Sequence, residues 1–238
     1  MTSVFHVADA NQLLAGLPNA ERDACIAVCE TVKLTFGQVL LEPTDTITHV
    51  YFPIDSFISL IAIIDTDNRL EVAMAGREGM LGASCVLGVA EAPLMALVQG
   101  AGSALRIKAV NFQGLLLKCP VLHLRLKRYI YVVMSQLAHS AACNHFHRIE
   151  ARLARWLLMT QDRAGSDQLH LTHEFLAMML GVRRAGITLA AIALQTRGLI
   201  RYHRGEITVL DRLGLIEASC GCYSKDKALY DNILPPPL

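Results

Sequence analysis

The sequence LTHEFLAMMLGVRRAGITLAAIALQTRGLIRYHRGEITVLDRLGL, Leu171 to Leu215, decides the fold of this chain. Its first apolar residues, Leu176, Met179 and Leu180, recur at the spacing of one helical face. Gly181 follows them directly, and glycine is the residue that most easily adopts the left-handed conformation that ends a helix. The start of this stretch therefore predicts a short helix that ends in a tight turn.

The residues after Gly181 predict a second helix and then a hairpin. The inner stripe of this helix consists of Ile187, Ala191 and Leu194. Two short strands then pivot on Arg204-Gly205. This order of helix, turn, helix and hairpin is typical of a winged helix-turn-helix, which lays its second helix in the major groove of DNA.

The outer face of the second helix supplies the candidate DNA contacts. An arginine near the start of such a helix binds guanine O6 and N7 as a bidentate pair, which is worth about 1 to 3 kcal/mol of discrimination. The residues expected to contact base edges are Arg183, Arg184 and Thr188. The residues expected to contact phosphates are Thr172, His173 and Arg204. The alternative is an ordinary helical hairpin with solvated arginines.

The charge distribution supports double-stranded DNA as the partner. Residues 1–119 hold 7 basic and 12 acidic side chains, a net charge of −5, whereas residues 120–212 hold 13 basic and 6 acidic ones, a net charge of +7. Nucleic-acid affinity depends on phosphate neutralisation, so a local excess of arginine matters more than the overall charge of +1. A solvated helical surface would give the same asymmetry.

Composition indicates a globular protein of the cytoplasm. The chain has 238 residues, of which 53% are hydrophobic, enough for one large domain or two small ones. The most apolar run, Gly79 to Leu105, is broken by glycines and a proline, so we expect no membrane segment. The N-terminus lacks the pattern of a secretory signal, and the seven cysteines are expected to be reduced.

The N-terminal half has the texture of a β domain. From Lys33 to about Lys108, short apolar runs alternate with turn residues, which predicts antiparallel strands in a barrel or jelly roll. Helices are expected before it, around Leu13 to Leu17 and from Ala20 to about Thr31. The predicted fold class is thus α+β. The predicted domains are residues 1–119, a sensor domain; 120–144, a long helix; and 145–238, the winged helix-turn-helix with a C-terminal tail.

The long helix after Pro120 carries an apolar stripe at steps of four and three: Leu122, Leu126, Ile130, Val133 and Leu137. This stripe can join two chains into a homodimer, or it can pack on the barrel of its own chain, and periodicity does not decide between the two. A further helix, from Asn144 to Asp162, places Leu153 and Trp156 on one side and Arg152 and Arg155 on the other.

The run from Leu171 to Leu215 resembles the C-terminal domain of the Crp/Fnr family of bacterial transcription regulators. The strongest matching pieces are Leu171-Thr172, Leu176-Ala177, Gly181, Arg184, Gly198-Leu199-Ile200, Arg204-Gly205 and Ile207 through Asp211. The upstream order of strands, long helix and Arg-rich helix is similar to the whole family architecture. The resemblance implies a cyclic-nucleotide-binding-like barrel, a homodimer joined along the long helix, and an effector that shifts the DNA domains between two placements.

The recognition helix departs from the family pattern. Members typically begin it with serine, arginine and glutamate and carry a second arginine one turn later, where this chain has Arg183, Arg184, Ala185 and Leu189. Only the first arginine of that set is kept, so the usual operator sequence is not expected. The exposed Leu189 and Ile192 would contact thymine methyl groups or be covered by a neighbouring part of the protein. Gly186 costs about 1 kcal/mol relative to alanine and predicts a less rigid helix.

The sensor region departs further from the family. Cyclic-nucleotide binders have a glycine-glutamate pair and then an arginine, whereas this chain reads Gly82-Ala83-Ser84-Cys85 and, later, Ala92-Pro93-Leu94-Met95-Ala96. A phosphate buried there without a counter-charge would cost several kcal/mol, so cyclic AMP is not the expected ligand. The candidates for an unknown small-molecule effector are the backbone amides around Gly79, Gly82 and Ala83.

Metal chemistry has scattered candidates. Cys25 and Cys29 lie one helical turn apart, Cys220 and Cys222 form a close pair, and His139 and Cys143 are four residues apart. No pair alone supplies the four ligands of a structural zinc or an iron–sulfur cluster. Consecutive i, i+2 residues of a helix diverge, so His145 and His147 are not expected to share an ion. We expect no metal site and no cofactor.

An enzyme is the weaker hypothesis. A metal-dependent cupin-like barrel needs several histidines on its strands, but the predicted barrel contains only His49. Nucleophile-elbow and Walker motifs are missing from the sequence, so no catalytic residue is predicted. Two alternatives to a plain regulator stay open, the cupin-like enzyme and a regulator that senses haem, metal or redox state. Metal content after purification would discriminate among them.

Overall fold

A computed structural model describes residues 11–65 and 68–235 of the chain. Its contacts divide the chain into two compact units. One unit comprises the described residues of Met1–Leu60, Ala73–Met134 and Leu229–Leu238, and the other comprises those of Ile61–Val72 and Ser135–Ala228.

Within residues 11–65 and 68–108, the N-terminal region forms seven strands in two antiparallel sheets. The strands are β1 (Glu30–Leu34), β2 (Val39–Leu41), β3 (His49–Pro53), β4 (Phe57–Ile63), β5 (Arg69–Ala75), β6 (Met95–Gly100) and β7 (Gly102–Lys108). One sheet has the order β1-β7-β3 and the other β2-β6-β4-β5. The expected jelly roll is confirmed, but the described strands leave two separate sheets rather than a closed barrel.

Two short helices precede the strands, α1 (Gln12–Ala15) and α2 (Asn19–Ile26). Asn11 caps α1 by accepting a hydrogen bond from the Leu13 amide, and its own amide group donates to the carbonyls of Pro53 and Gly79. The second helix ends earlier than the sequence predicted, and β1 already begins at Glu30. The residues Glu30 to Leu34 pair in register with Gly102 to Arg106 of β7, and this pairing outweighs the helical pattern.

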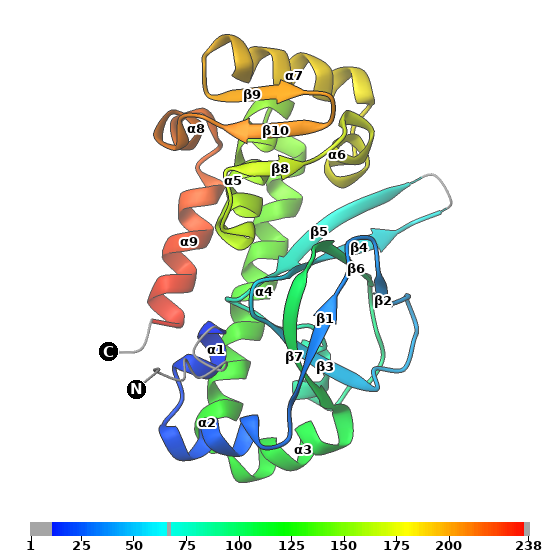
Figure 1. Ribbon diagram of the computed structural model, residues 1–238, viewed down its shortest axis with the longest axis vertical. Coiled ribbons are helices and arrows are strands. Elements are labelled where there is room, and N and C mark those ends of the chain that lie inside the picture. The colour runs from blue at the N-terminus through cyan, green and yellow to red at the C-terminus, as the bar shows by residue number, and fades with distance from the viewer. Residues whose placement is uncertain (1–10, 66–67, 236–238) are drawn as a thin grey trace. The chain divides into compact units, whose positions relative to one another are not determined.

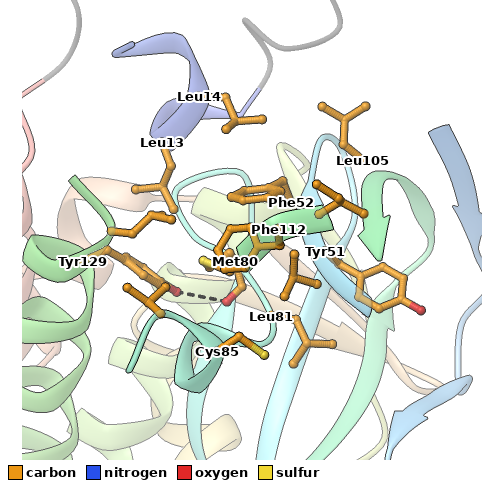
Figure 2. Packing of buried hydrophobic residues seen from close by; sticks show 14 of the residues in the cluster. Leu13, Leu14, Tyr51, Phe52, Met80, Leu81, Cys85, Leu105, Phe112 and Tyr129 are labelled. Carbon is orange, nitrogen blue, oxygen red and sulfur yellow. Dashed lines mark hydrogen bonds between the residues drawn. The ribbon is translucent and has the colours of Figure 1, made fainter. Parts of the chain in front are cut away.

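A single apolar cluster fills the N-terminal unit. Figure 2 shows its centre, where Phe112 lies among side chains from the strands, the N-terminal helix and the segment around Met80. Tyr129 reaches this cluster from the long helix and donates a hydrogen bond of 3.5 Å to the Met80 carbonyl. The 3₁₀ helix η2 (Ala83–Leu87) and helix α3 (Ala109–Lys118) complete the packing.

The long helix α4 runs from Pro120 to Phe146, and its two faces differ. Leu122 and Leu126 are fully buried in the N-terminal unit, so the start of the predicted stripe packs on its own chain. The opposite face exposes Val121, Leu124, Tyr131 and Met134. The periodicity therefore predicted the helix, but the exposed apolar face is a different one.

The second unit contains α5 (Ile149–Ala164), α6 (His173–Leu180), α7 (Arg184–Thr196), α8 (Arg212–Ala218) and the start of α9 (Cys222–Ile233). Its sheet has the order β8-β10-β9, formed by β8 (Gln168–His170), β10 (Glu206–Val209) and β9 (Ile200–His203). Figure 1 shows these three strands side by side next to α6, α7 and α8.

Among the described residues, no single helix has the length and apolar character needed to cross a membrane. Helices α6 and α7 meet that criterion only when they are taken together, and they are bent by 108° at the break between them.

Candidate DNA-binding surface

Helices α6 and α7 form a helix-turn-helix of ordinary geometry. Thr172 caps α6, because its hydroxyl oxygen accepts a 3.1 Å hydrogen bond from the Phe175 amide. Gly181 ends the helix with a φ of 61°, the left-handed conformation predicted for it. Arg152 of α5 donates a hydrogen bond to the Leu180 carbonyl at this turn. The two helices meet at 108°, within the range of helix-turn-helix motifs.

The start of α7 presents its arginines to solvent. Arg183 is the N-cap in extended conformation, and Arg184 is the first helical residue. Both are exposed, and within the described residues neither guanidinium forms an ion pair. The inner stripe of Ile187, Ala191 and Leu194 is buried, as predicted. The helix is thus fixed on its inner side and open at its basic end.

Leu189 and Ile192 continue the outer face of α7. Their side chains are 69% and 55% exposed. The sequence left open whether a neighbouring segment covers these two side chains. Among the described residues, no segment covers them. An exposed apolar strip beside two arginines is the composition expected of a surface that contacts thymine methyl groups next to guanines.

Thr188 and His173 form a contact between the two helices and the hairpin. The Thr188 hydroxyl donates to the Arg184 carbonyl and shares a 3.0 Å hydrogen bond with Nδ1 of His173. The His173 ring stacks on Tyr202 of β9 at a centroid distance of 4.1 Å. Burial and, secondarily, the charge of Arg184 lower the pKa of His173. The histidine is therefore held as a neutral ring that aligns α6, α7 and the hairpin.

The wing follows α7 and ends in a tight turn. Arg204 and Gly205 have φ values of 48° and 84°, the pattern of a two-residue hairpin turn with two left-handed positions. The Tyr202 amide donates a 2.7 Å hydrogen bond to the Gln195 side chain, which ties β9 to α7. Arg204 is exposed at the tip of the hairpin. The neighbouring Gly205 lies close to Thr172, so the tip of the hairpin is near the start of α6.

Gly186 lies close to a neighbouring helix, which the sequence did not indicate. A Cβ atom built at this position would lie 2.9 Å from Cδ1 of Ile149 in α5. Because Cδ1 is the end of a flexible side chain, a larger residue at this position would need only a small shift of Ile149.

Several arginines of residues 120–212 are engaged in ion pairs and are not part of the candidate DNA-binding surface. Arg155 is buried and pairs with Asp226 at 2.7 Å. Two further arginines are partly exposed and paired, Arg197 with Glu150 at 3.0 Å and Arg212 with Asp162 at 2.6 Å. Of these three carboxylates, only Asp226 lies outside residues 120–212, so only its pairing with Arg155 lowers the net positive charge counted for that range.

The candidate effector residues lie in the packed N-terminal unit. A Cβ atom on Gly79 would collide with the hydroxyl of Tyr129 at 2.4 Å, and one on Gly82 would meet Val50 at 2.8 Å. Gly82 has a φ of 88° and precedes the 3₁₀ helix that begins at Ala83. The two glycines thus serve close packing and a left-handed turn.

Four side chains of types that bind metal ions lie close together in the second unit. The sequence did not indicate that all four would meet. Cys143 and His147 from the end of α4 meet Cys220 and Cys222 from the start of α9, with all four ligand atoms within 4.8 Å of one another. Residues this far apart in the sequence give no local signal, and only the spacing of four between Cys143 and His147 hinted at a shared face.

Comparisons with known proteins agree with this geometry. Residues 151–218 match the model of the Crp-like helix-turn-helix domain. A regulator of the Crp/Fnr family from Eubacterium rectale is similar in structure, with a TM-score of 0.67 at 18% identity over 88% of this chain and 98% of its own. FixK2 from Bradyrhizobium japonicum gives a TM-score of 0.68 at 14% identity over 82% of this chain and 98% of its own.

A third similar structure is the c-di-GMP-responsive global regulator CLP from Xanthomonas campestris, with a TM-score of 0.66 at 16% identity over 81% of this chain and 99% of its own. A search of curated protein sequences gives no match.

The chain thus combines an N-terminal jelly roll with a C-terminal helix-turn-helix. Residues 151–218 are a Crp-like helix-turn-helix domain, and the chain as a whole has the fold of the Crp/Fnr transcription regulators. The proteins it resembles are regulators and not enzymes, so the cupin-like alternative is not favoured.

Proposed function

We propose that this chain regulates transcription by binding a specific DNA operator as a homodimer. The observation that carries the proposal is the basic end of α7, where Arg183 and Arg184 are exposed and Ile187 anchors the opposite face. This arrangement lets α7 enter a major groove with both guanidinium groups leading. Arg184 and Arg183 are proposed to bind guanines, and Thr188 supports them from the same face.

Phosphate contacts are proposed on both sides of α7. The first turn of α6, from Thr172 and His173, offers backbone amides and the positive end of the helix dipole. Arg204 offers a guanidinium at the tip of the wing. Because the ring of His173 is engaged with Thr188 and Tyr202, its contribution is assigned to its backbone amide.

The dimer contact is proposed on the exposed face of α4. Val121, Leu124, Tyr131 and Met134 lie opposite the buried Leu122, within one stretch of helix. Two such faces packed against each other would remove these apolar side chains from water. A homodimer of this kind requires a pseudo-palindromic operator with half-sites about one helical turn apart.

The jelly roll is proposed to receive an unidentified signal. The segment with Gly79, Gly82 and Ala83 is the candidate effector region, by its correspondence to the ligand segment of the resembled family. The lack of a buried counter-charge there argues against cyclic AMP.

Selection of bound sequences from random DNA duplexes, with the purified full chain, tests the function. We expect enrichment of a two-fold symmetric motif. In the same assay, Arg184→Ala should relax the preference at one base pair of each half-site, whereas Arg197→Ala, at the other end of the same helix, should keep it. Failure to enrich any motif with or without cell extract metabolites, or equal weakening by Arg184→Ala on every sequence, would contradict the proposal.

A further inference from the structure

The side chains of Cys143, His147, Cys220 and Cys222 form a compact cluster in the second unit. The Cys143 and Cys220 sulfurs are 3.4 Å apart, and the Cys222 sulfur is 3.7 Å from Nδ1 of His147. Each of the four ligand atoms lies within 4.8 Å of the others. We propose that these four residues bind one Zn²⁺ in a closed Cys₃His site that has a structural role.

The distances fit a single tetrahedral ion. Zinc–sulfur bonds of about 2.3 Å at tetrahedral angles place two ligand sulfurs about 3.7 Å apart. The observed separations lie close to that value, so small rotations of the side chains complete the geometry. An iron–sulfur cluster spreads its ligands over several iron atoms and needs a wider arrangement. Four protein ligands also leave no open position for a water molecule, which is the mark of a structural site.

Local structure presents the ligands in two pairs. Cys143 and His147 are one turn apart, and the His147 amide still donates to the Cys143 carbonyl at 3.1 Å, although α4 ends at Phe146. Both side chains therefore share a face of the helix end. The second pair flanks Gly221, and the Tyr223 amide donates to the Cys220 carbonyl as α9 begins. This tight turn directs two sulfurs to one point.

The electrostatic surroundings favour a thiolate-rich site. Three thiolates and one Zn²⁺ leave one net negative charge, which needs a positive neighbour when it is buried. Arg155 is buried, and its positive charge interacts with the sulfurs of Cys143 and Cys220. Arg152, one turn earlier on the same helix, is also buried, and its charge interacts with the same two sulfurs. Both arginines belong to α5, the helix that packs against the helix-turn-helix.

The position of the cluster indicates what the metal does. One ligand pair precedes and the other follows residues 151–218, the segment that matches the Crp-like helix-turn-helix domain. A metal clip that joins the two ends of a long loop removes conformational freedom from the unfolded chain. The ion would thus hold together the two segments that flank the helix-turn-helix domain. The ligands are separate from Arg183 and Arg184, the residues proposed to contact DNA.

Titration with Co²⁺ tests the site, because tetrahedral Co²⁺ with thiolate ligands has intense visible bands and sulfur charge-transfer bands that octahedral Co²⁺ lacks. The full-length chain is reduced, treated with a chelator, desalted and titrated with Co²⁺ and then Zn²⁺. We expect one equivalent of tetrahedral Co²⁺, displaced by one equivalent of Zn²⁺. Zn²⁺ should also raise the midpoint of thermal unfolding.

Matched variants locate the ligands. Cys222→Ser and His147→Ala change less buried residues and should weaken Co²⁺ binding by tenfold or more while the circular dichroism spectrum stays unchanged. His145→Ala, two residues away and exposed, and Cys29→Ser, in the other unit, are the controls and should bind as the original chain does. Purely octahedral Co²⁺ spectra, or tetrahedral bands that survive both ligand variants, would overturn the proposal.

Oxidation gives a second decisive result. A disulfide between Cys143 and Cys220 would form by loss of two protons and two electrons to an added oxidant. Thiol titration in denaturant then counts two fewer than the seven thiols of the reduced chain. Zn²⁺ should protect these thiols from diamide. If the chain forms this disulfide equally fast with Zn²⁺ present, the cluster is a thiol pair and not a metal site.

Discussion

The buried ion pair between Arg155 and Asp226 provides a quantitative test of the second unit. Both side chains are about one-tenth exposed, and the Arg155 Nη2 atom is 2.7 Å from the Asp226 carboxylate. The other carboxylate oxygen lies 2.6 Å from Nδ1 of His139. Burial by itself lowers the pKa of Arg155, but the attraction and hydrogen bond of Asp226 outweigh it, so the net pKa is raised. The Asp226 carboxylate therefore offsets the free-energy cost of burying the charged guanidinium of Arg155.

Asp226→Asn keeps the shape of the side chain and removes its charge. Loss of one partner of a buried pair costs about 3 to 5 kcal/mol, because the other charge stays buried without compensation. Since the asparagine oxygen still accepts one hydrogen bond, we expect a loss near the lower end, about 3 kcal/mol. At about 2 to 4 °C per kcal/mol for a chain of this size, the midpoint of thermal unfolding should fall by about 6 to 12 °C.

Urea unfolding followed by tryptophan fluorescence measures this loss directly, because Trp156 is the one tryptophan of the chain and lies in α5 beside Arg155. Glu150→Gln is the matched control. This change breaks the ion pair between Glu150 and Arg197, whose side chains are 38% and 48% exposed respectively. The loss should cost less than about 1 kcal/mol of unfolding free energy. If Asp226→Asn costs no more than Glu150→Gln, the argument from burial is refuted.

Three further predictions follow from the proposed surfaces. Leu124→Glu should convert the proposed dimer to monomers in light scattering, because it places a charge in the apolar face of α4. Leu117→Glu, which makes the same change at an 88% exposed leucine of α3, should leave the dimer intact. A dimer that survives Leu124→Glu contradicts the assigned contact. Arg204→Ala should weaken binding to all duplexes alike and reduce the slope of log affinity against log salt by about one; a change in sequence preference instead would assign it to a base. The pKa of His173 is lowered in the folded chain, so the unfolded chain binds a proton at a higher pH than the folded chain does. The free energy of unfolding should therefore fall as the pH drops below about 6.5. His173→Asn should flatten that part of the pH profile of urea unfolding, and an unchanged profile would exclude the histidine as the cause.

The helix-turn-helix was predictable because its signals are local. The stripe of Ile187, Ala191 and Leu194 and the left-handed Gly181 each depend on a few neighbouring residues, and the structure buries the stripe and ends α6 at that glycine. Gly186 shows where local reasoning stops. Its propensity cost is visible in the sequence, but the close approach of Ile149 from another helix is not.

Helix α4 shows a second limit. Its sequence is apolar on more than one face, so a period near 3.6 residues predicts a helix without telling which face is buried. The tertiary packing decides that Leu122 and Leu126 belong to the core and leaves Leu124 and Met134 exposed. The cluster of Cys143 with Cys220 shows the same limit for sites, since two residues 77 positions apart meet only after the whole second unit has folded.

The charge of the basic half shows why counting residues overstates a DNA-binding surface. The sequence gives residues 120–212 a net charge of +7. Among their arginines, however, Arg155 compensates a carboxylate that lies outside that range, Asp226, and is unavailable to phosphate. Arg152 is buried and serves the Leu180 carbonyl at the turn between α6 and α7. This hydrogen bond ties α5 to the last residue of α6, directly before the turn that leads to Arg183 and Arg184. Part of the positive charge of this range is therefore used inside the second unit and is not available at its surface.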